Sequence, residues 1–293
     1  MQPLFILQGT MKNSAYYKTK TILINTIVYL FLTMVALSCI FPLAWMVSSS
    51  LKTQEDIFKD MSLVPKGFHF ENYYLALKEG EFGRYFLNSI FYTVAVVFGI
   101  VVVASLAAYA FSRFQFQGKN FIFYVFMAAM MIPIPGSFVA LYVLLNKLHL
   151  RNTALGYILC MINVGLSTSI FLLKTFFDKM PKELEDAARI DGCSKLGIWR
   201  HVALPLAKPV LAVVVVFNAL NVWNEFILAL IIFDTKQLMP LQVALQQNFQ
   251  GEFITRYPLL MAGLTITAIP IIVVYLLMQK YIIKGVTAGA VVG

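Results

Sequence analysis

The chain has 293 residues, of which 60% are hydrophobic and only 13% are charged, and its formal net charge is +9. This composition excludes an ordinary soluble domain, because the apolar residues also fall in long blocks. No basic and aromatic surface motif accompanies the positive charge, so a nucleic-acid partner is not expected. The three cysteines and three histidines are scattered along the chain and predict neither a disulfide framework nor a metal site.

Six apolar blocks are long enough to cross a bilayer, which takes about 20 mostly apolar residues in a helix. We therefore expect an all-α membrane protein with six transmembrane helices. The first block is longer than a signal-peptide core and lacks a small-residue cleavage site after it, which indicates a retained anchor. Pro42 should kink the first span, and Pro133 and Pro135 should break the third, as a hinge or as a fixed kink. The expected spans are residues 22–47, 85–111, 120–146, 154–176, 206–233 and 258–278.

Six spans place both termini on one side of the membrane. Fourteen of the 23 Lys and Arg residues fall on that side, so the positive-inside rule assigns it to the cytoplasm. Lys147 and Arg151, in a short outer segment, oppose this assignment. The expected organisation is a cytoplasmic amino-terminal segment (1–21), a six-span domain (22–284) and a cytoplasmic tail (285–293).

A polar segment between the fourth and fifth spans, residues 181–205, reads PKELEDAARIDGCSKLGIWRHVALP. Pro181 suits the first turn of a helix, and the acidic residues after it suit the positive end of the helix dipole. Gly192 should end this helix with a positive φ, and Ser194 should cap a second short helix that Pro205 ends. Such a helix–Gly–helix element has little apolar area of its own, so it needs a partner.

Within this segment the sequence reads D-A-A, three residues, G, nine residues, V-x-L-P. The pattern resembles the "EAA" loop of bacterial ABC importer permeases, which is written E-A-A, three residues, G, nine residues, I-x-L-P. Asp186 stands in place of the usual Glu, and Val202 in place of Ile. The resemblance implies a cytoplasmic coupling element that docks into a groove of a separate ATPase. The coupling residues that it implies are Asp186, Ala187, Ala188, Gly192, Leu204 and Pro205.

An alternative for the same segment is an amphipathic helix lying on the lipid surface. Such helices favour Trp, Phe and Leu on their apolar face, whereas this segment offers Ala187 and Ala188. The coupling interpretation is therefore preferred.

Other stretches resemble carbohydrate-importing members of the same family, in particular the second maltose-type permease subunit: SSLKT, NYYLAL, WNEF and the tail KGVTAGAVVG. The resemblance implies a bacterial cell-membrane protein that forms a heterodimer with a second homologous permease. It also implies two cytoplasmic ABC ATPases, an extracytoplasmic solute-binding protein and a sugar substrate. The chain has no GxxxxGK[ST] loop, so it should not be an enzyme; no cofactor is expected in it, and ATP and Mg²⁺ should bind to the ATPase subunits.

Polar groups inside a span are costly and tend to face a cavity or another helix. The fifth span carries several of them in FNALNVWNEFILAL, where amides and a carboxylate could hydrogen-bond sugar hydroxyls. The same amides could instead hydrogen-bond between helices and hold the bundle together. A further alternative is an ion-coupled secondary transporter that uses Glu225. The translocation-path candidates are Asn218, Asn221, Asn224 and Glu225.

Overall fold

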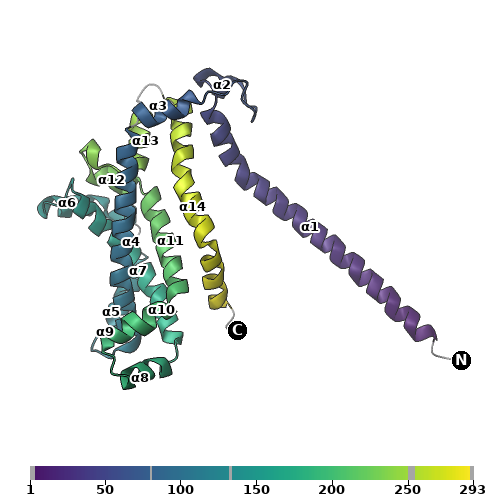
Figure 1. Cartoon of the computed structure of the whole chain (residues 1–293), viewed down its shortest axis with the longest axis vertical. Coiled ribbons are helices and arrows are strands. Elements are labelled where there is room, and N and C mark those ends of the chain that lie inside the picture. Colours follow the sequence, from purple (N-terminus) through teal and green to yellow (C-terminus); the bar gives the residue numbers. More distant parts are fainter. Residues whose placement is uncertain (1–3, 80, 132–133, 250–254, 291–293) are drawn as a thin grey trace.

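The computed structural model describes residues 4–79, 81–131, 134–249 and 255–290, and nearly all of these residues lie in helices. Within these described residues, four helices are long and apolar enough to cross a membrane, and a bent helix pair, Lys195–Leu206 with Lys208–Asn224, makes a fifth if it is taken as one span. The four helices are α1 (Leu4–Ser50) over Thr21–Ser50, α4 (Phe82–Arg113), α7 (Ala154–Lys179), and α14 (Tyr257–Ala290) over Tyr257–Gln279. Helices α4, α7, α11 (Lys208–Asn224) and α14 pack into a bundle, from which α1 extends (Figure 1).

The expected third span, residues 120–146, is not one continuous helix. It consists of α5 (Lys119–Ala129), the 3₁₀ turn η1 (Ile134–Ser137) and α6 (Phe138–Lys147). Helices α5 and α6 have 11 and 10 residues, so neither alone has the length of a span. The predicted break is present: Pro135 lies in η1, where a proline that cannot donate a backbone hydrogen bond is tolerated, while Pro133 lies outside the described residues.

The expected fifth span, residues 206–233, is also interrupted. A bend of 79° separates the helices up to Leu206 from α11, and α11 ends at Asn224. The chain is extended at Glu225 and then forms α12 (Ile227–Ile232). The long run of valines and leucines in this region does not reveal these breaks, because tertiary packing decides them.

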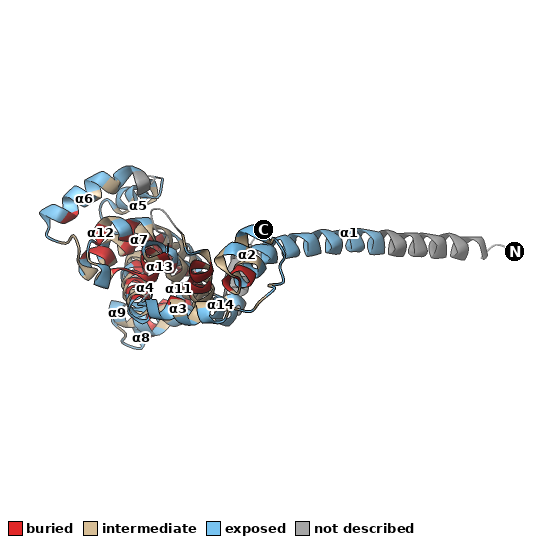
Figure 2. Cartoon of the chain, turned by 90° about the horizontal axis from the view of Figure 1, so that it is seen from above, coloured by how far each residue is buried: buried red, intermediate tan, exposed pale blue. Residues whose placement is uncertain are grey.

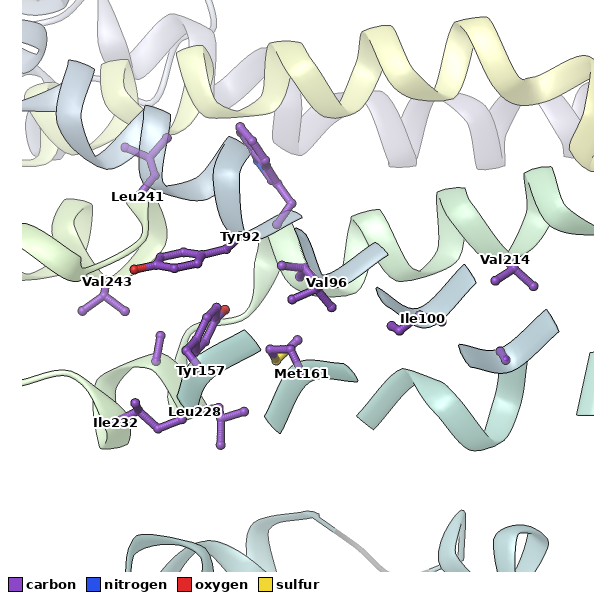
Figure 3. Close-up of a cluster of buried hydrophobic side chains, with 14 of the residues drawn as sticks. Tyr92, Val96, Ile100, Tyr157, Met161, Val214, Leu228, Ile232, Leu241 and Val243 are labelled. Carbon is purple, nitrogen blue, oxygen red and sulfur yellow. The ribbon is translucent and has the colours of Figure 1, made fainter. Parts of the chain in front are cut away.

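The core of the bundle lies where α4 packs against α7 and α11, and α12 packs against α7. One face of α4 presents Val96, Ile100 and Ala104 at helical spacing, and all three are buried. Tyr92 of α4 and Tyr157 of α7 meet edge to face, with ring centroids 4.9 Å apart (Figure 3). This packing makes α4 and α7 the central pair of the fold.

Gly165 of α7 allows α4, α7 and α11 to approach one another closely. A Cβ at this position would overlap with the side-chain oxygen of Asn218 on α11 and with the Ile100 side chain on α4. Any larger residue there would push these helices apart.

The segments that join the helices gather at two opposite ends of the bundle (Figure 1). One end holds α2 (Gln54–Lys59), α3 (Glu71–Glu79) and α13 (Leu241–Phe249). The buried Lys52 ammonium holds the residues after α2 by donating to the Asp60 and Ser62 carbonyls, at 2.9 and 2.6 Å. The Ser62 backbone N–H, with help from Lys66, keeps the pKa of the Asp60 carboxyl below its ordinary value.

Helix α1 continues through Pro42 without ending. Every side chain from residue 21 to residue 44 is exposed, which is visible where α1 projects from the body (Figure 2). Helix α14 continues to Ala290, so residues 285–290 of the expected tail form its last turns, and residues 291–293 lie outside the described residues.

Candidate functional site

The end of the bundle opposite α2 and α3 is formed by the segment between α7 and α11 (Figure 1). The segment contains α8 (Glu183–Ile190), α9 (Lys195–Ile198), the π-helical turn η2 (Trp199–Ala203) and α10 (Leu204–Leu206). Gly192 has a φ of +84°, and the Ser194 hydroxyl accepts the Gly197 N–H at 3.1 Å. The predicted helix stop and the predicted cap are therefore both confirmed.

Two local details of the prediction are wrong. Pro181 does not lie in the first turn, since α8 begins at Glu183. Pro205 does not end the second helix, because it lies inside α10. It is in the first turn of α10, where a backbone N–H has no partner within the helix and proline is therefore tolerated. The chain turns only after Leu206, at the 79° bend that starts α11.

The residues singled out on α8 differ in exposure. Asp186 and Ala187 are exposed, whereas Ala188 is buried against the body of the protein. The Asp186 carboxylate accepts a hydrogen bond from Arg189 at 2.9 Å, an exposed pair within one helix. Gly192 is exposed and a Cβ there would meet open space, so its positive φ, not crowding, makes glycine suitable. Leu204 is half-buried and Pro205 is exposed.

Besides Ala187, helices α8 and α9 carry large apolar side chains that are exposed. Ile190 is 87% exposed, Leu196 is 63% exposed and Leu184 is 44% exposed. We call Leu184, Ala187, Ile190 and Leu196 the docking face. Large apolar side chains so open to water mark an interaction surface more often than a lone exposed leucine does. The signal available in the sequence was Ile190, which continues the three-residue spacing of Leu184 and Ala187.

Glu185, directly before Asp186, has the opposite environment. Its carboxylate is buried and pairs with Arg113 at the end of α4, with Nε and Oε1 2.5 Å apart. The Tyr109 hydroxyl donates to Oε2 at 3.2 Å, and the Arg113 guanidinium also donates to the Met180 carbonyl at 2.7 Å. Sequence reasoning counted Arg113 only as an orienting charge and treated Glu185 only as an acid in a first helical turn.

The four path candidates of the fifth span do not converge on one surface. Asn218 is buried, and its amide donates to Ser169 of α7 at 3.0 Å and to the Val214 carbonyl at 2.8 Å. Asn221 and Asn224 are exposed, and the Asn224 amide donates to the Leu220 carbonyl of its own helix. This pattern agrees with the alternative in which Asn218 joins two helices.

Glu225 lies at the break between α11 and α12. Its Oε1 accepts the backbone N–H of Leu228 at 2.6 Å, so the carboxylate satisfies a donor in the first turn of α12. Asp and Glu suit this position because the amino-terminal end of a helix is positive.

A cavity of about 360 Å³ lies between α7, the broken α5–α6 region and α12. Its polar lining comes from Asn163, Ser167 and Thr168, at successive turns of one face of α7, and from Ser137 of η1. Leu141 and Leu228 are among its apolar lining residues. A cavity of this size with mixed lining falls in the range of small-molecule sites, about 300–1,000 Å³. Sequence reasoning missed α7, where hydroxyl and amide groups are spaced along one helical face.

The described residues contain no group of three or more His, Cys, Asp or Glu side chains that could hold a metal ion.

Known proteins with similar sequences include transport proteins of the membrane. The model of a family described as "Binding-protein-dependent transport system inner membrane component" matches residues 73–288. YurM of Bacillus subtilis (strain 168), described as a probable ABC transporter permease protein, is 37% identical over 91% of this chain and 87% of its own length. NgcG of Streptomyces coelicolor, a permease protein of a diacetylchitobiose uptake system, is 32% identical over 85% of this chain and 83% of its own.

The fold also resembles a solved structure. One chain of a bacterial ABC transporter involved in the import of the acidic polysaccharide alginate matches with a TM-score of 0.78. The match covers 89% of this chain and 96% of that chain, at 24% sequence identity. At this identity the likeness concerns the fold alone.

Proposed function

This chain belongs to the family of binding-protein-dependent transport system inner membrane components, and on that premise we propose that it is a permease subunit of an ATP-driven importer of a sugar or oligosaccharide. Relatives that carry the names of oligosaccharide transport systems support the substrate class. The observation that carries the coupling part of the proposal is the docking face on α8 and α9, which is apolar, exposed and held on a short, capped element.

We propose that the chain crosses the membrane six times. The broken α5–η1–α6 segment would be the third crossing, and α11 with α12 the fifth. Both termini would then lie on the same side as α8, in the cytoplasm. In support, the start of α1 and the end of α14 point toward the end of the bundle that carries α8 (Figure 1). The excess of Lys and Arg on that side supports the same orientation.

On the cytoplasmic side, the docking face would enter a groove of an ABC ATPase subunit. Ile190 supplies the largest exposed apolar side chain, and the small Ala187 allows close approach. The positive φ of Gly192 sets the direction of the chain between α8 and α9. Asp186 would exchange its exposed pairing with Arg189 for a basic group of the ATPase, since exposed ion pairs within a helix contribute little energy.

The remaining partners follow from the proposed role. A second, homologous permease would supply the other half of the translocation path, and two ATPase subunits would bind ATP and Mg²⁺. An extracytoplasmic solute-binding protein would deliver the sugar at the end that carries α2, α3 and α13. Closure of the ATPases would move α8 and α9, and the spans would change between inward and outward access.

Within the membrane, we propose that the sugar passes along the polar face of α7. Asn163, Ser167 and Thr168 offer one amide and two hydroxyls at the cavity, and Leu141 and Leu228 offer apolar area for the sugar ring. Of the fifth-span candidates, the exposed Asn221 and Asn224 stay compatible with a path, while Asn218 is engaged in hydrogen bonds between helices.

The test is purification of the tagged chain from its native membrane, followed by uptake assays in proteoliposomes. We expect an ATPase, a second permease and a binding protein to be needed for uptake of a sugar, driven by ATP. A chain that purifies alone and takes up solute along an ion gradient, without ATP, would contradict the proposal and support the carrier built on Glu225. Nothing in the comparisons or in the environment of Glu225, which caps α12, favours that carrier.

A further inference from the structure

We propose that helix α4 transmits movement of α8 to the opposite face of the membrane, and we call α4 in this role the α4 rod. The Arg113–Glu185 ion pair connects α8 to one end of α4, and we call it the lower joint. This inference rests on the proposed function, since it assigns the route of coupling within this chain. Two observations support it: a buried ion pair at the carboxyl-terminal end of α4, and a set of hydrogen bonds near its amino-terminal end.

The lower joint connects three separate pieces of the chain. Arg113 ends α4, Glu185 lies in α8, and Met180 lies just after α7. The two charged side chains are each only 7% exposed, and both carboxylate oxygens are occupied, one by Arg113 and one by the Tyr109 hydroxyl. The guanidinium uses a second nitrogen for the Met180 carbonyl. Arg suits this position because its planar group can donate in two directions at fixed geometry.

Within the described residues, the Glu185 carboxylate makes side-chain hydrogen bonds from α8 to two residues of α4, Tyr109 and Arg113. The more extensive contacts of α8 are with α9 and η2, which belong to the same segment. A buried ion pair is weak evidence for stability, because apolar residues of similar volume often stabilise a protein as well. Such a pair instead fixes the position of α8 relative to α4. If the Glu185 carboxylate left the Arg113 guanidinium, two buried charges would remain without partners, so α4 should follow when α8 moves.

The upper end of α4 is joined to the segment before α13. Asn88 donates to the Gln237 and Met239 carbonyls at 2.8 and 3.0 Å, and Tyr92 donates to the Leu238 carbonyl at 2.8 Å. The Ser89 hydroxyl accepts the Leu241 N–H at 2.8 Å. Segment 237–241 is therefore fastened to the first turns of α4 by four hydrogen bonds.

Between these two joints α4 is one uninterrupted helix without proline, whereas α5–α6 and α10–α12 are broken. Its buried stripe packs along α7, and Figure 3 shows part of this contact, from Tyr92 to Ile100 beside Tyr157 and Met161. A displacement of α8 therefore moves segment 237–241, and a load on that segment moves α8, because coupling between two sites is reciprocal. Helix α4 is thus a continuous element that reaches from one end of the bundle to the other with polar contacts at each end.

The test uses the complete importer in proteoliposomes, with Glu185→Gln as the main variant. The amide keeps the shape of the side chain and removes its charge. We expect the variant to assemble with its ATPases and to keep basal ATP hydrolysis, while sugar taken up per ATP falls about tenfold. Stimulation of hydrolysis by the sugar-loaded binding protein should fall by a similar factor. Glu183→Gln, the same substitution on an exposed side of the same helix, should leave both quantities within about twofold.

Two further variants separate coupling from folding. Arg113→Lys keeps the charge but, as a single point donor, cannot hold Glu185 and Met180 together in the same geometry, so it should show a partial loss of sugar per ATP. Asn88→Ala, at the other end of α4, should reproduce the loss of stimulation by the binding protein. Normal sugar uptake per ATP in Glu185→Gln would overturn the inference. Failure of both Glu185→Gln and Arg113→Lys to assemble would overturn it too, because the pair would then serve folding.

The failure of this inference is distinguishable from failure of the proposed function. If the wild-type importer shows no ATP-driven uptake, the proposed function is wrong whatever the variants do. If the wild type transports and Glu185→Gln transports equally well per ATP, only the α4 rod is wrong.

Discussion

Helices α8 and α11 both carry polar residues within an apolar neighbourhood, but they use them in opposite ways. On α8, Asp186 and Ala187 are exposed, and the large apolar side chain of Ile190 is exposed with them. On α11, Asn218 is buried and its amide donates to two oxygens inside the bundle. Regularly spaced polar residues therefore indicate a solvent-exposed surface only where no other helix packs against that face of the segment.

The same contrast exists within α8 itself. Glu185 and Asp186 are adjacent acids in the first turns of one helix, yet one is buried against Arg113 and the other is exposed. Successive helical positions point about 100° apart, so neighbours in sequence can face the body and the solvent respectively.

The largest effect that would sharpen this comparison is expected for Ala187→Glu. The new carboxylate would lie in the centre of the docking face, beside the Asp186 carboxylate, and would have to be desolvated on contact with an ATPase. Uptake should fall to background while the chain still inserts into the membrane. Gln117→Glu, which adds the same charge at an exposed position in the loop between α4 and α5, is the control and should transport normally. Normal uptake by Ala187→Glu would remove the docking face from the coupling surface.

A smaller effect, on stability instead of coupling, is expected for Asn218→Ala. The change removes the hydrogen bonds to Ser169 and Val214 and leaves a space beside Gly165. The expected loss is about 1–3 kcal/mol in the free energy of unfolding, measured by thermal or denaturant unfolding in detergent. Asn221→Ala, on the exposed side of the same helix, should change the stability by less than about 0.5 kcal/mol. Equal stability of the two variants would show that Asn218 does not hold α7 and α11 together.

Gly192→Ala tests the backbone conformation that joins α8 to α9. A Cβ meets no neighbour there, so the only penalty is the positive φ, which costs a non-glycine residue about 1–2 kcal/mol. Gly83→Ala in α4 also enters open space but without a positive φ, so it should be neutral or stabilising by about 0.5–1 kcal/mol. Thermal unfolding of both variants would distinguish them. A Gly192→Ala variant as stable as Gly83→Ala would argue that α8 and α9 can be joined by another backbone conformation.

The smallest effect is expected for Glu225→Gln. The amide oxygen can still accept the Leu228 N–H, so α12 keeps its first turn and the stability should change by less than about 0.5 kcal/mol. ATP-driven uptake should stay within about twofold of the wild type. An ion-coupled carrier would need the ionisable group, so abolished uptake in Glu225→Gln would restore that alternative.

Features that depend on a few neighbouring residues could be predicted from the sequence. Gly192 ends α8 and Ser194 caps α9, because positive φ and an N-terminal cap are decided within one turn of backbone. The break near Pro133 and Pro135 followed from the chemistry of proline in the same way. The expected third and fifth spans were drawn as single units, however, and the structure divides both.

The candidate site was predicted only in part. The polar segment 181–205 was recognised as an element that needs a partner, but Ile190, its most exposed large apolar side chain, was not singled out. The amides of α11 were more conspicuous in sequence than Asn163 and Ser167 of α7, although the α7 residues line the cavity. Residue type and spacing do not reveal which face of an apolar helix is covered.

By itself, the sequence determined the membrane class of this protein, its long helices and the conformation of the short polar element, since hydrophobic length, helix capping and glycine geometry act locally. Only the tertiary structure decided that Glu185 pairs with Arg113, that Asn218 meets Ser169, and that the docking face stays open. These contacts join residues far apart in the chain, and the burial of a polar group depends on what packs against it.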